Sequence, residues 1–468
     1  MESTSRKLQL KSEVGLMGGV SLIAGVMIGS GIFMSPQTVL LNIGSPGASL
    51  VIWACCGLLS MLASLSYAEL GTVIRESGGE YIYIIRTSGK LMAFIFAFTS
   101  VLVVRPTSMT GLALSLAQNA VAPFYEDCEP PEVVLKTVAA VSLLILVIMN
   151  CLNVRFSVAV TTVLMAVKFL ALLVISIGGV VLLIQGNTMN LQNAFEGTSK
   201  SVGVIGMAFY QCLWSYDGWN NLNSVTEELK RPEVNLPRAL MIAIPMVTIL
   251  YLLVNVSYLA AMTPREMMAS SAVAVTWGNK VMGSWGWVMS IAAALSSLGS
   301  LNGSFFSGGR VCFVAAREGH MPNILAMAHV RRLTPAPALI FTTIISLIVL
   351  IPGDFQGIVN FFSFTAWFFY GVTIAGLLYL KIKFPELPRT YTVPIFIPIL
   401  VLLASVFLVL APIVDKPQLE YLYVTIFILS GALIYIPLIH YKLCPHLLDK
   451  LTVFLQLFLE VAPADKNV

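Results

Sequence analysis

The chain has 468 residues, of which 57% are hydrophobic and 11% are charged, and its mean hydropathy is +0.88. Because an ordinary soluble domain carries about 25% charged residues, this composition excludes a water-soluble globule. The net charge of +4 is small, and the basic residues lie at the ends of apolar segments. Membrane lipid is therefore an expected partner, and nucleic acid is not.

Apolar segments along the chain predict twelve membrane-spanning helices, since a helix needs about 20 apolar residues to cross the hydrocarbon core. The predicted spans are residues 16–41, 48–70, 91–121, 133–152, 157–184, 201–226, 237–262, 285–311, 335–351, 357–380, 393–414 and 420–441. The polar start runs into the first span without a small-residue cleavage site, so we expect no cleaved signal peptide. The predicted class is an all-α polytopic membrane protein.

The charges of the loops predict the orientation, because cytoplasmic loops collect Lys and Arg near the ends of spans. One alternating set of loops, which includes both termini, holds most of the basic residues. The opposite set holds Lys200, Arg265, Lys280 and Lys416. We therefore expect both the N-terminus and the C-terminus to be cytoplasmic.

Two predicted spans are interrupted at corresponding places, the first by Gly29-Ser30-Gly31 and the sixth by residues 214–219. Each interruption begins a group of five spans. An odd number of crossings places the second group upside down relative to the first, which is the inverted-repeat plan of secondary transporters. The predicted organisation is a cytoplasmic N-terminus (1–15), a first five-helix repeat (16–184), an extracellular loop (185–200), a second, inverted repeat (201–380), two added helices (381–443) and a cytoplasmic amphipathic tail (444–468).

The two interruptions predict a binding site for a zwitterion. Backbone groups freed inside the bilayer must be satisfied, and facing a solvated cavity is one permitted solution. N–H groups beside Ser30 and Gly31, at the positive end of a half-helix, suit a carboxylate, while carbonyl groups around Ile28 and Trp214 suit an ammonium. Small residues here also allow close packing of helices, which is the structural alternative.

Asp217 lies near the middle of the sixth span, where an ionised carboxylate costs about 2.5–3.5 kcal/mol on insertion scales. Its negative potential favours a cationic substrate side chain, such as that of lysine or arginine. Trp214 is placed to cover a ligand or to stack on a guanidinium. The alternatives are an internal ion pair or a protonated structural carboxyl for Asp217, and simple packing for Trp214.

Lys168 and Thr107 are further candidates within spans. Lys168 is a lone cation in the fifth span and needs an acceptor. A fixed ammonium at unwound carbonyl groups replaces a sodium ion, although a lysine paired within the bundle is an equal alternative. Thr107, in the third span, either lines the pocket or bonds to the backbone of its own helix.

Cys128 stands in an acidic loop that the charge pattern assigns to the extracellular, oxidising side. No second cysteine is evident on that side, so an intermolecular disulfide and a free thiol are the two alternatives. The four histidines form no metal-ligand pattern, and the chain contains neither a nucleophile elbow nor a metalloprotease helix. We expect no metal, no cofactor and no enzymatic activity.

Several motifs together resemble the light chains of heteromeric amino-acid transporters, over nearly the whole chain. They are Gly29-Ser30-Gly31-Ile32-Phe33, Tyr67-Ala68-Glu69-Leu70-Gly71, Ser77-Gly78-Gly79-Glu80-Tyr81, residues 214–219 with Thr226-Glu227-Glu228, and Arg317-Glu318-Gly319-His320. Within that family, residues 214–219 and 408–431 are similar to the b(0,+) type, which exchanges cystine and dibasic amino acids for neutral ones.

The resemblance implies the amino-acid/polyamine/organocation fold, also called the LeuT fold, with helices 1 and 6 unwound. It implies sodium-independent obligatory exchange by alternating access at the plasma membrane. The implied roles are substrate-backbone binding by Ile28, Ser30 and Gly31, lining of the side-chain region by Thr107, Trp214, Asp217 and Asn220, replacement of a sodium ion by Lys168, and a disulfide from Cys128 to a single-span glycoprotein heavy chain.

The sequence departs from the b(0,+) pattern at two places. Gln211-Cys212 stands where asparagine-glycine is expected, and Val461-Ala462-Pro463-Ala464 replaces a double proline followed by an acid. Exchange of neutral or aromatic amino acids is therefore an alternative to exchange of cystine and cationic ones. A transport-silent membrane scaffold for the heavy chain is the alternative from a different class, but it leaves the paired helix breaks without a purpose.

Overall fold

The computed structural model describes residues 15–74, 78–126, 128–223, 229–329, 331, 334–415, 419–440 and 445–463. Within these ranges, nine helices are long and apolar enough to cross a membrane, and the bent pair α1 (Leu16–Met27) and α2 (Gly31–Ile43) makes a tenth if it counts as one span. The predicted sixth and ninth spans are the shorter helices α9 (Val202–Tyr216) and α14 (Ala336–Leu350), of 15 residues each. The all-α polytopic class is confirmed, and the number of twelve crossings stays a prediction.

The first half of the chain continues from α2 through a sharp turn. Gly44, with φ of +87°, caps α2 in the left-handed region, and Pro46 occupies the first turn of the next helix, where its missing N–H costs no hydrogen bond. The following elements are α3 (Pro46–Val73), α4 (Glu80–Thr87), α5 (Lys90–Thr99), η1 (Ser100–Val104), α6 (Arg105–Val121), η2 (Ala122–Phe124), α7 (Glu132–Leu152) and α8 (Val154–Ile184).

The predicted third span is a single helix with a local bulge. Pro106, at the start of α6, has no N–H to continue the α-helical ladder, and η1 directly before it is a π-helix. Helices α5, η1 and α6 therefore follow one another without a turn, and together with η2 they cover residues 90–124.

The second half is also almost entirely helical. Its elements are η3 (Met189–Leu191), α9, α10 (Pro232–Ala261), α11 (Pro264–Ala269), α12 (Val273–Val281), η5 (Gly283–Trp285), α13 (Trp287–Arg317), η6 (Asn323–Ala326), β1 (Met327–His329), α14 and α15 (Phe355–Lys383). The chain ends with α16 (Phe396–Asp415), α17 (Leu419–Tyr435), η7 (Ile436–His440), α18 (Pro445–Leu459) and β2 (Val461–Pro463).

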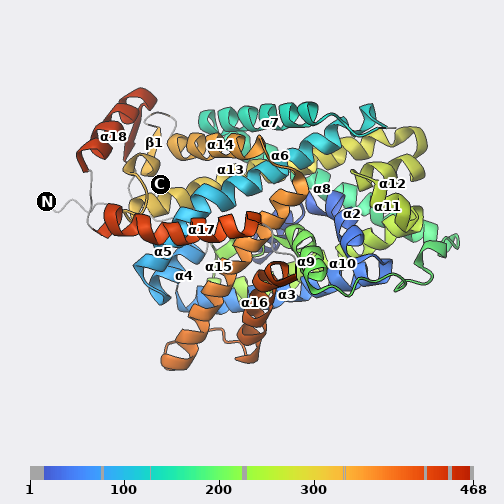
Figure 1. Ribbon diagram of the computed structural model, residues 1–468, viewed down its shortest axis with the longest axis horizontal. Helices are drawn as coiled ribbons and strands as arrows, with labels where there is room; N and C mark the ends of the chain where they lie inside the picture. Colours follow the sequence, from blue (N-terminus) through green and yellow to red (C-terminus); the bar gives the residue numbers. More distant parts are fainter. Residues whose placement is uncertain are drawn as a thin grey trace.

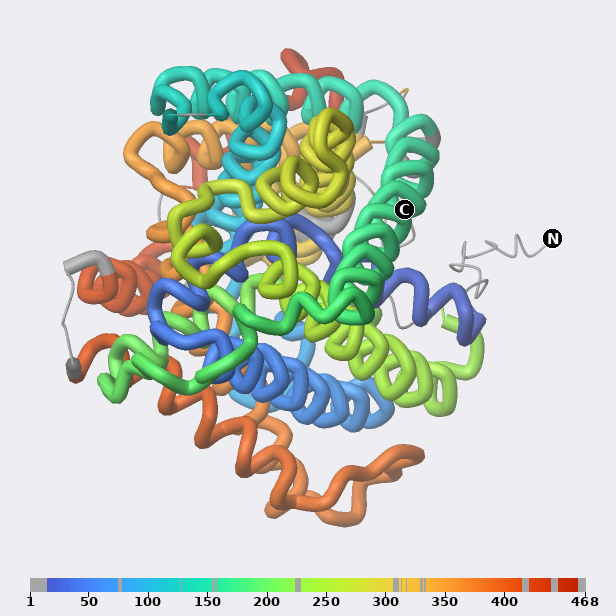
Figure 2. The backbone as a smooth tube through the Cα atoms, turned by 90° about the vertical axis from the view of Figure 1, so that its right-hand side faces the viewer, coloured from blue at the N-terminus to red at the C-terminus, as the bar shows by residue number. Residues whose placement is uncertain are grey.

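Most long helices run along the long axis of the molecule, with α18 at one end and α11 and α12 at the opposite end (Figure 1). Figure 2 shows the dark-blue start of the chain passing through the middle of the bundle. Helix α2 packs against α9, and α1 packs against α10. The broken first crossing is therefore enclosed by helices of the second half, and side chains such as Ile28, Ile32 and Phe33 are fully buried.

The C-terminal tail forms the helix that the sequence predicts, followed by a short strand. Helix α18 exposes large apolar side chains, among them Leu447, Phe454 and Phe458, which suits a helix lying in the membrane interface. Strand β2 then pairs antiparallel with β1, with Ala328 opposite Ala462. This pairing ties the tail to the segment between α13 and α14.

Candidate functional site

The first crossing is interrupted where the sequence predicts. Helix α1 ends at Met27, Ile28 turns to an extended conformation with ψ of 97°, and α2 starts at Gly31 with its axis bent by 50°. Within the described ranges, the N–H groups of Gly31 and Ile32 have no hydrogen-bond acceptor. Two donors at the positive end of α2 are therefore available to an anion.

Helix α9 ends where the sequence predicts the second interruption. Helix α9 ends at Tyr216, Asp217 is extended, and Gly218 has φ of +107°, a conformation that favours glycine. A Cβ atom on Gly218 would lie 2.5 Å from Cγ1 of Val26 in α1. The turn after α9 therefore needs glycine both for its backbone conformation and for its close approach to the first crossing.

The two interruptions face each other. A Cβ atom on Gly31 would lie 2.6 Å from Cα of Ser215, so the start of α2 lies directly against the end of α9. The hydroxyl of Tyr251, in α10, lies 2.7 Å from the Met27 carbonyl oxygen and 2.8 Å from the Ser215 carbonyl oxygen. One phenol thus connects the last turns of α1 and α9, donating its proton to one carbonyl at a time.

Trp214 covers the first interruption. Its Nε1 donates to the Ser30 hydroxyl at 3.0 Å. The indole ring packs edge-on against Phe355 and Phe362, with ring centroids 6.1 and 5.1 Å away. Trp214 therefore connects the two breaks, and it is both a hydrogen-bond donor and a lid of apolar surface.

Lys168, in α8, connects its own helix to α1 and α13. Its Nζ donates to the Gly25 carbonyl oxygen of α1 at 3.0 Å and to the Ser300 hydroxyl of α13 at 2.9 Å, and the residue is 3% exposed. The predicted need for a backbone acceptor is met by a carbonyl in the last turn of α1. The Gly29 carbonyl is bound in the same way, by the hydroxyl of Ser296 at 3.2 Å.

Asp217 faces a hydroxyl and a cation rather than a direct ion-pair partner. The Tyr370 hydroxyl of α15 donates to Asp217 Oδ1 at 2.9 Å. The Arg105 guanidinium of α6 is near enough to attract this carboxylate, but among the described residues none forms a salt bridge with it. Asp217 is neither fully buried nor exposed, and its carboxylate keeps no contact ion pair within the described residues.

Thr107 and Asn220 have different surroundings. Thr107 is 3% exposed, and its hydroxyl makes no hydrogen bond to its own helix or to any other described group. Asn220 follows the second break, and its Nδ2 donates to Oε1 of Glu80 in α4. The amide of Asn220 is thus engaged by Glu80, which the sequence reasoning did not single out as a functional residue.

Glu80 lies outside the spans but reaches the turn after α9. Burial raises the pKa of its carboxyl to about 6, against the hydrogen bond from Asn220 and the positive charge of Arg105. The Tyr67 hydroxyl lies 3.4 Å from the same carboxyl oxygen. Glu80 and Asn220 are 140 positions apart in the sequence. The only sequence signal for their contact was therefore the motif that contains Glu80.

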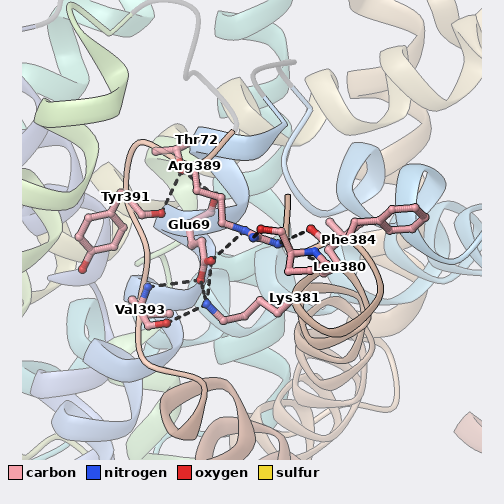
Figure 3. Close-up of polar contacts among 9 residues, drawn as sticks. Glu69, Thr72, Leu380, Lys381, Phe384, Arg389, Tyr391 and Val393 are labelled. Atoms are coloured by element: carbon pink, nitrogen blue, oxygen red, sulfur yellow. Dashed lines mark hydrogen bonds and ion pairs between the residues drawn. The ribbon is translucent and has the colours of Figure 1, made fainter. Parts of the chain in front are cut away.

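A separate ion-pair cluster connects the C-terminal ends of α3 and α15 (Figure 3). Glu69 is fully buried, and its two carboxyl oxygens lie 2.8 and 2.9 Å from Lys381 Nζ. Arg389 Nε lies 3.3 Å from the same carboxylate, and Lys381 also donates to the Val393 carbonyl at 2.7 Å. The cluster fixes the segment after α15 against α3.

Cys128 lies between η2 and α7, is exposed, and has a free thiol in the described part of the chain. The same part of the chain contains no group of three or more His, Cys, Asp or Glu side chains arranged to hold a metal ion. The exposure of Cys128 is compatible with both alternatives that the sequence leaves open for it, an intermolecular disulfide and a free thiol.

A bundle of apolar helices in which a broken crossing meets the end of a further apolar helix, α9, fits the architecture of a secondary transporter. The chain belongs to the amino acid permease family, which it matches over residues 15–437. The family resemblance predicted from the motifs is thereby confirmed, and the protein is a multi-pass membrane protein of a transporter family.

Three relatives illustrate the range of the similarity. The chain is 48% identical to the b(0,+)-type amino acid transporter 1 of Homo sapiens over 460 residues, which is 98% of this chain and 94% of the relative. It is 40% identical to the cystine/glutamate transporter of Homo sapiens over 466 residues, 99% of this chain and 93% of the relative. It is 43% identical to the large neutral amino acids transporter small subunit 2 of Homo sapiens over 411 residues, 87% of this chain and 77% of the relative.

Proposed function

We propose that this protein is a sodium-independent amino-acid exchanger of the plasma membrane, which moves cystine and cationic amino acids against neutral ones by alternating access. The observation that carries the proposal is the meeting of the start of α2 with the end of α9, where the N–H groups of Gly31 and Ile32 have no acceptor among the described residues. The similarity to the b(0,+)-type transporter supports the choice of substrates.

The breaks supply the chemistry for the part that all amino acids share. The unbonded N–H groups of Gly31 and Ile32, beside Ser30, hold the substrate carboxylate. The carbonyl groups at Ile28 and at the end of α9 hold its ammonium. Because these are backbone groups, they leave the substrate side chain unspecified.

The side-chain region lies toward Thr107, Trp214, Asp217 and Asn220. The buried Thr107 hydroxyl has no internal partner among the described residues, and Trp214 offers an aromatic face over the site. Asp217 supplies the negative charge that favours lysine and arginine. Asn220 acts at the far edge of this region through its bond to Glu80.

Lys168 stands in place of a coupling ion. Its ammonium bonds a carbonyl of α1 and a hydroxyl of α13, which are oxygen ligands of the kind that a sodium ion takes. A permanently attached cation at this point removes the need for a sodium gradient.

Alternating access follows from two inverted five-helix repeats, residues 16–184 and 201–380, with residues 381–443 added. Both termini lie in the cytoplasm. Cys128 forms a disulfide to a single-span glycoprotein heavy chain, which is supported by the exposure of its thiol and by the words "small subunit" in the name of one relative.

One observation favours exchange of neutral amino acids as a second candidate. The positive charge of Arg105 acts on Asp217 and partly offsets the negative charge that attracts cationic substrates. The relative named for large neutral amino acids supports the same candidate.

Uptake into proteoliposomes tests the proposal. We expect rapid uptake of radiolabelled arginine into vesicles loaded with leucine and little uptake into empty vesicles, because exchange is obligatory. Equal uptake into loaded and empty vesicles would contradict obligatory exchange. We expect Asp217→Gly to lower arginine uptake more than leucine uptake, whereas equal losses would show that the carboxylate is structural.

A further inference from the structure

Glu80 connects a helix outside the spans to the turn that carries Asp217. Asn220 donates to the Glu80 carboxylate and lies three positions after Asp217 in the same turn. The Tyr67 hydroxyl, from α3, lies 3.4 Å from the same Glu80 oxygen. The turn after α9 therefore holds one acid directly and a second acid through the amide of Asn220.

Arg105 acts on both acids. Its charge attracts the carboxylates of Asp217 and Glu80, and the two carboxylates repel each other. Within the residues that the structure describes, Arg105 makes no salt bridge at contact distance with either acid. The three groups thus form a charge cluster without a closed ion pair.

Buried aromatic rings surround this cluster. Tyr67 packs against Trp219 and Tyr370, with ring centroids 4.7 and 6.2 Å away, and all three rings are at most 6% exposed. Tyr370 in turn donates to Asp217. Because apolar walls reduce the screening of charges, each charge of the cluster affects the others and a nearby ligand strongly.

The sum of the charges explains why a second acid is needed. Asp217 and Arg105 alone would sum to zero, and a cationic substrate would gain little from such a pair. With Glu80 ionised, the cluster carries one net negative charge. We propose that Glu80 is a second specificity-determining residue for cationic substrates, whose charge offsets that of Arg105 and leaves Asp217 to attract the substrate side chain.

The inference deepens the proposed function and rests on it, since it requires Asp217 to face the substrate. Glu80 itself acts through the electrostatic field of its carboxylate and through its hydrogen bond with Asn220. It is a positioning and charge-balancing residue rather than a substrate ligand.

The inference predicts a dependence on pH. Burial raises the pKa of Glu80 to about 6, so its negative charge is present above that pH and is lost as the pH falls through it. The preference for arginine over leucine should therefore fall in mildly acid solution. The groups that face Glu80 are Tyr67 from α3, Arg105 from α6, Asp217 and Asn220 from the turn after α9, and Tyr370 from α15.

A cycle of charge variants tests the inference, with the ratio of arginine uptake to leucine uptake into leucine-loaded proteoliposomes as the readout. Glu80→Gln keeps an oxygen to accept from Asn220 but removes the charge. We expect it to lower the ratio roughly three- to tenfold at about pH 7.5, the effect of removing one partly screened charge near the site. The pH dependence of the ratio should also disappear. Arg105→Gln should raise the ratio, and the double variant should return it toward the wild-type value.

Glu233→Gln, which removes an acid from the first turn of α10, is the matched control and should leave the ratio unchanged. A wild-type ratio in Glu80→Gln, together with a lowered ratio in Asp217→Gly, would overturn the role of Glu80 and leave the proposed function standing. A wild-type ratio in both variants would instead remove selection by Asp217. Should Glu80→Gln not fold, the wild-type protein decides, because a ratio that is constant between about pH 5 and pH 7.5 contradicts a titrating Glu80.

Discussion

Replacing Gly31 by alanine should weaken substrate binding without unfolding the protein. The added Cβ would lie 2.6 Å from Cα of Ser215, and because that atom belongs to the backbone, no side-chain rotation relieves the overlap. Overpacking of this kind costs about 1–3 kcal/mol. The start of α2 must therefore move away from α9, and the two breaks no longer face each other as they do in the wild type.

The size of the effect on transport follows from the hydrogen bonds at risk. A hydrogen bond to a charged group contributes about 1.5–3 kcal/mol, so loss of one bond to the substrate carboxylate should raise KM roughly 10- to 100-fold. Initial rates of leucine-driven arginine uptake into proteoliposomes measure this change. Thermal unfolding in detergent measures the cost to the fold separately.

Gly303→Ala is the matched control, since a Cβ atom at Gly303 of α13 would have no neighbour within 4 Å. We expect it to keep the wild-type KM and to stabilise the protein by about 1 kcal/mol, because alanine is the better helix former. A wild-type KM in Gly31→Ala would refute the close facing of the two breaks as a requirement for binding.

Three further predictions concern residues around the site and at the ends of helices. Lys168→Met leaves the Gly25 carbonyl without its charged donor, which costs about 1–3 kcal/mol; we expect exchange to fall in both sodium and choline buffers, and unchanged exchange would show that the lysine is dispensable. Glu69→Gln leaves buried cations unpaired and should lower the stability measured in thermal unfolding by about 3–5 kcal/mol. The double variant Glu69→Gln with Lys381→Met should recover part of this lost stability. Equal destabilisation in the single and double variants would argue against the ion pair. Cys128→Ser should abolish a reductant-sensitive adduct of the native membrane protein in nonreducing electrophoresis, and its persistence would place the bond at another cysteine.

The helix breaks could be predicted from sequence because their cause is local. Gly29-Ser30-Gly31 weakens helix formation within an apolar run, and Gly218 permits a left-handed turn directly after Asp217. Both breaks occur at these residues. The need of Lys168 for a backbone acceptor was equally predictable, since a buried ammonium must be bonded.

Contacts between distant segments could not be predicted in this way. The bond between Asn220 and Glu80 depends on how α4 packs against the turn after α9, and the Tyr251 hydroxyl reaches both breaks from α10. Neither follows from periodicity or hydropathy. The number of crossings is a separate matter. The sequence predicts a sixth span, but α9 ends at Tyr216 after 15 residues and is too short to be recognised by length as a crossing.

Competition between arginine and decarboxylated arginine tests most directly whether the paired breaks bind the amino-acid backbone. Both compounds carry the same guanidinium, and only arginine carries the carboxylate that Gly31 and Ile32 would bind. We expect unlabelled arginine to inhibit radiolabelled arginine uptake into leucine-loaded proteoliposomes, and its decarboxylated form to inhibit it hardly at all. Equal inhibition by the two compounds would contradict recognition of the zwitterion by the two breaks.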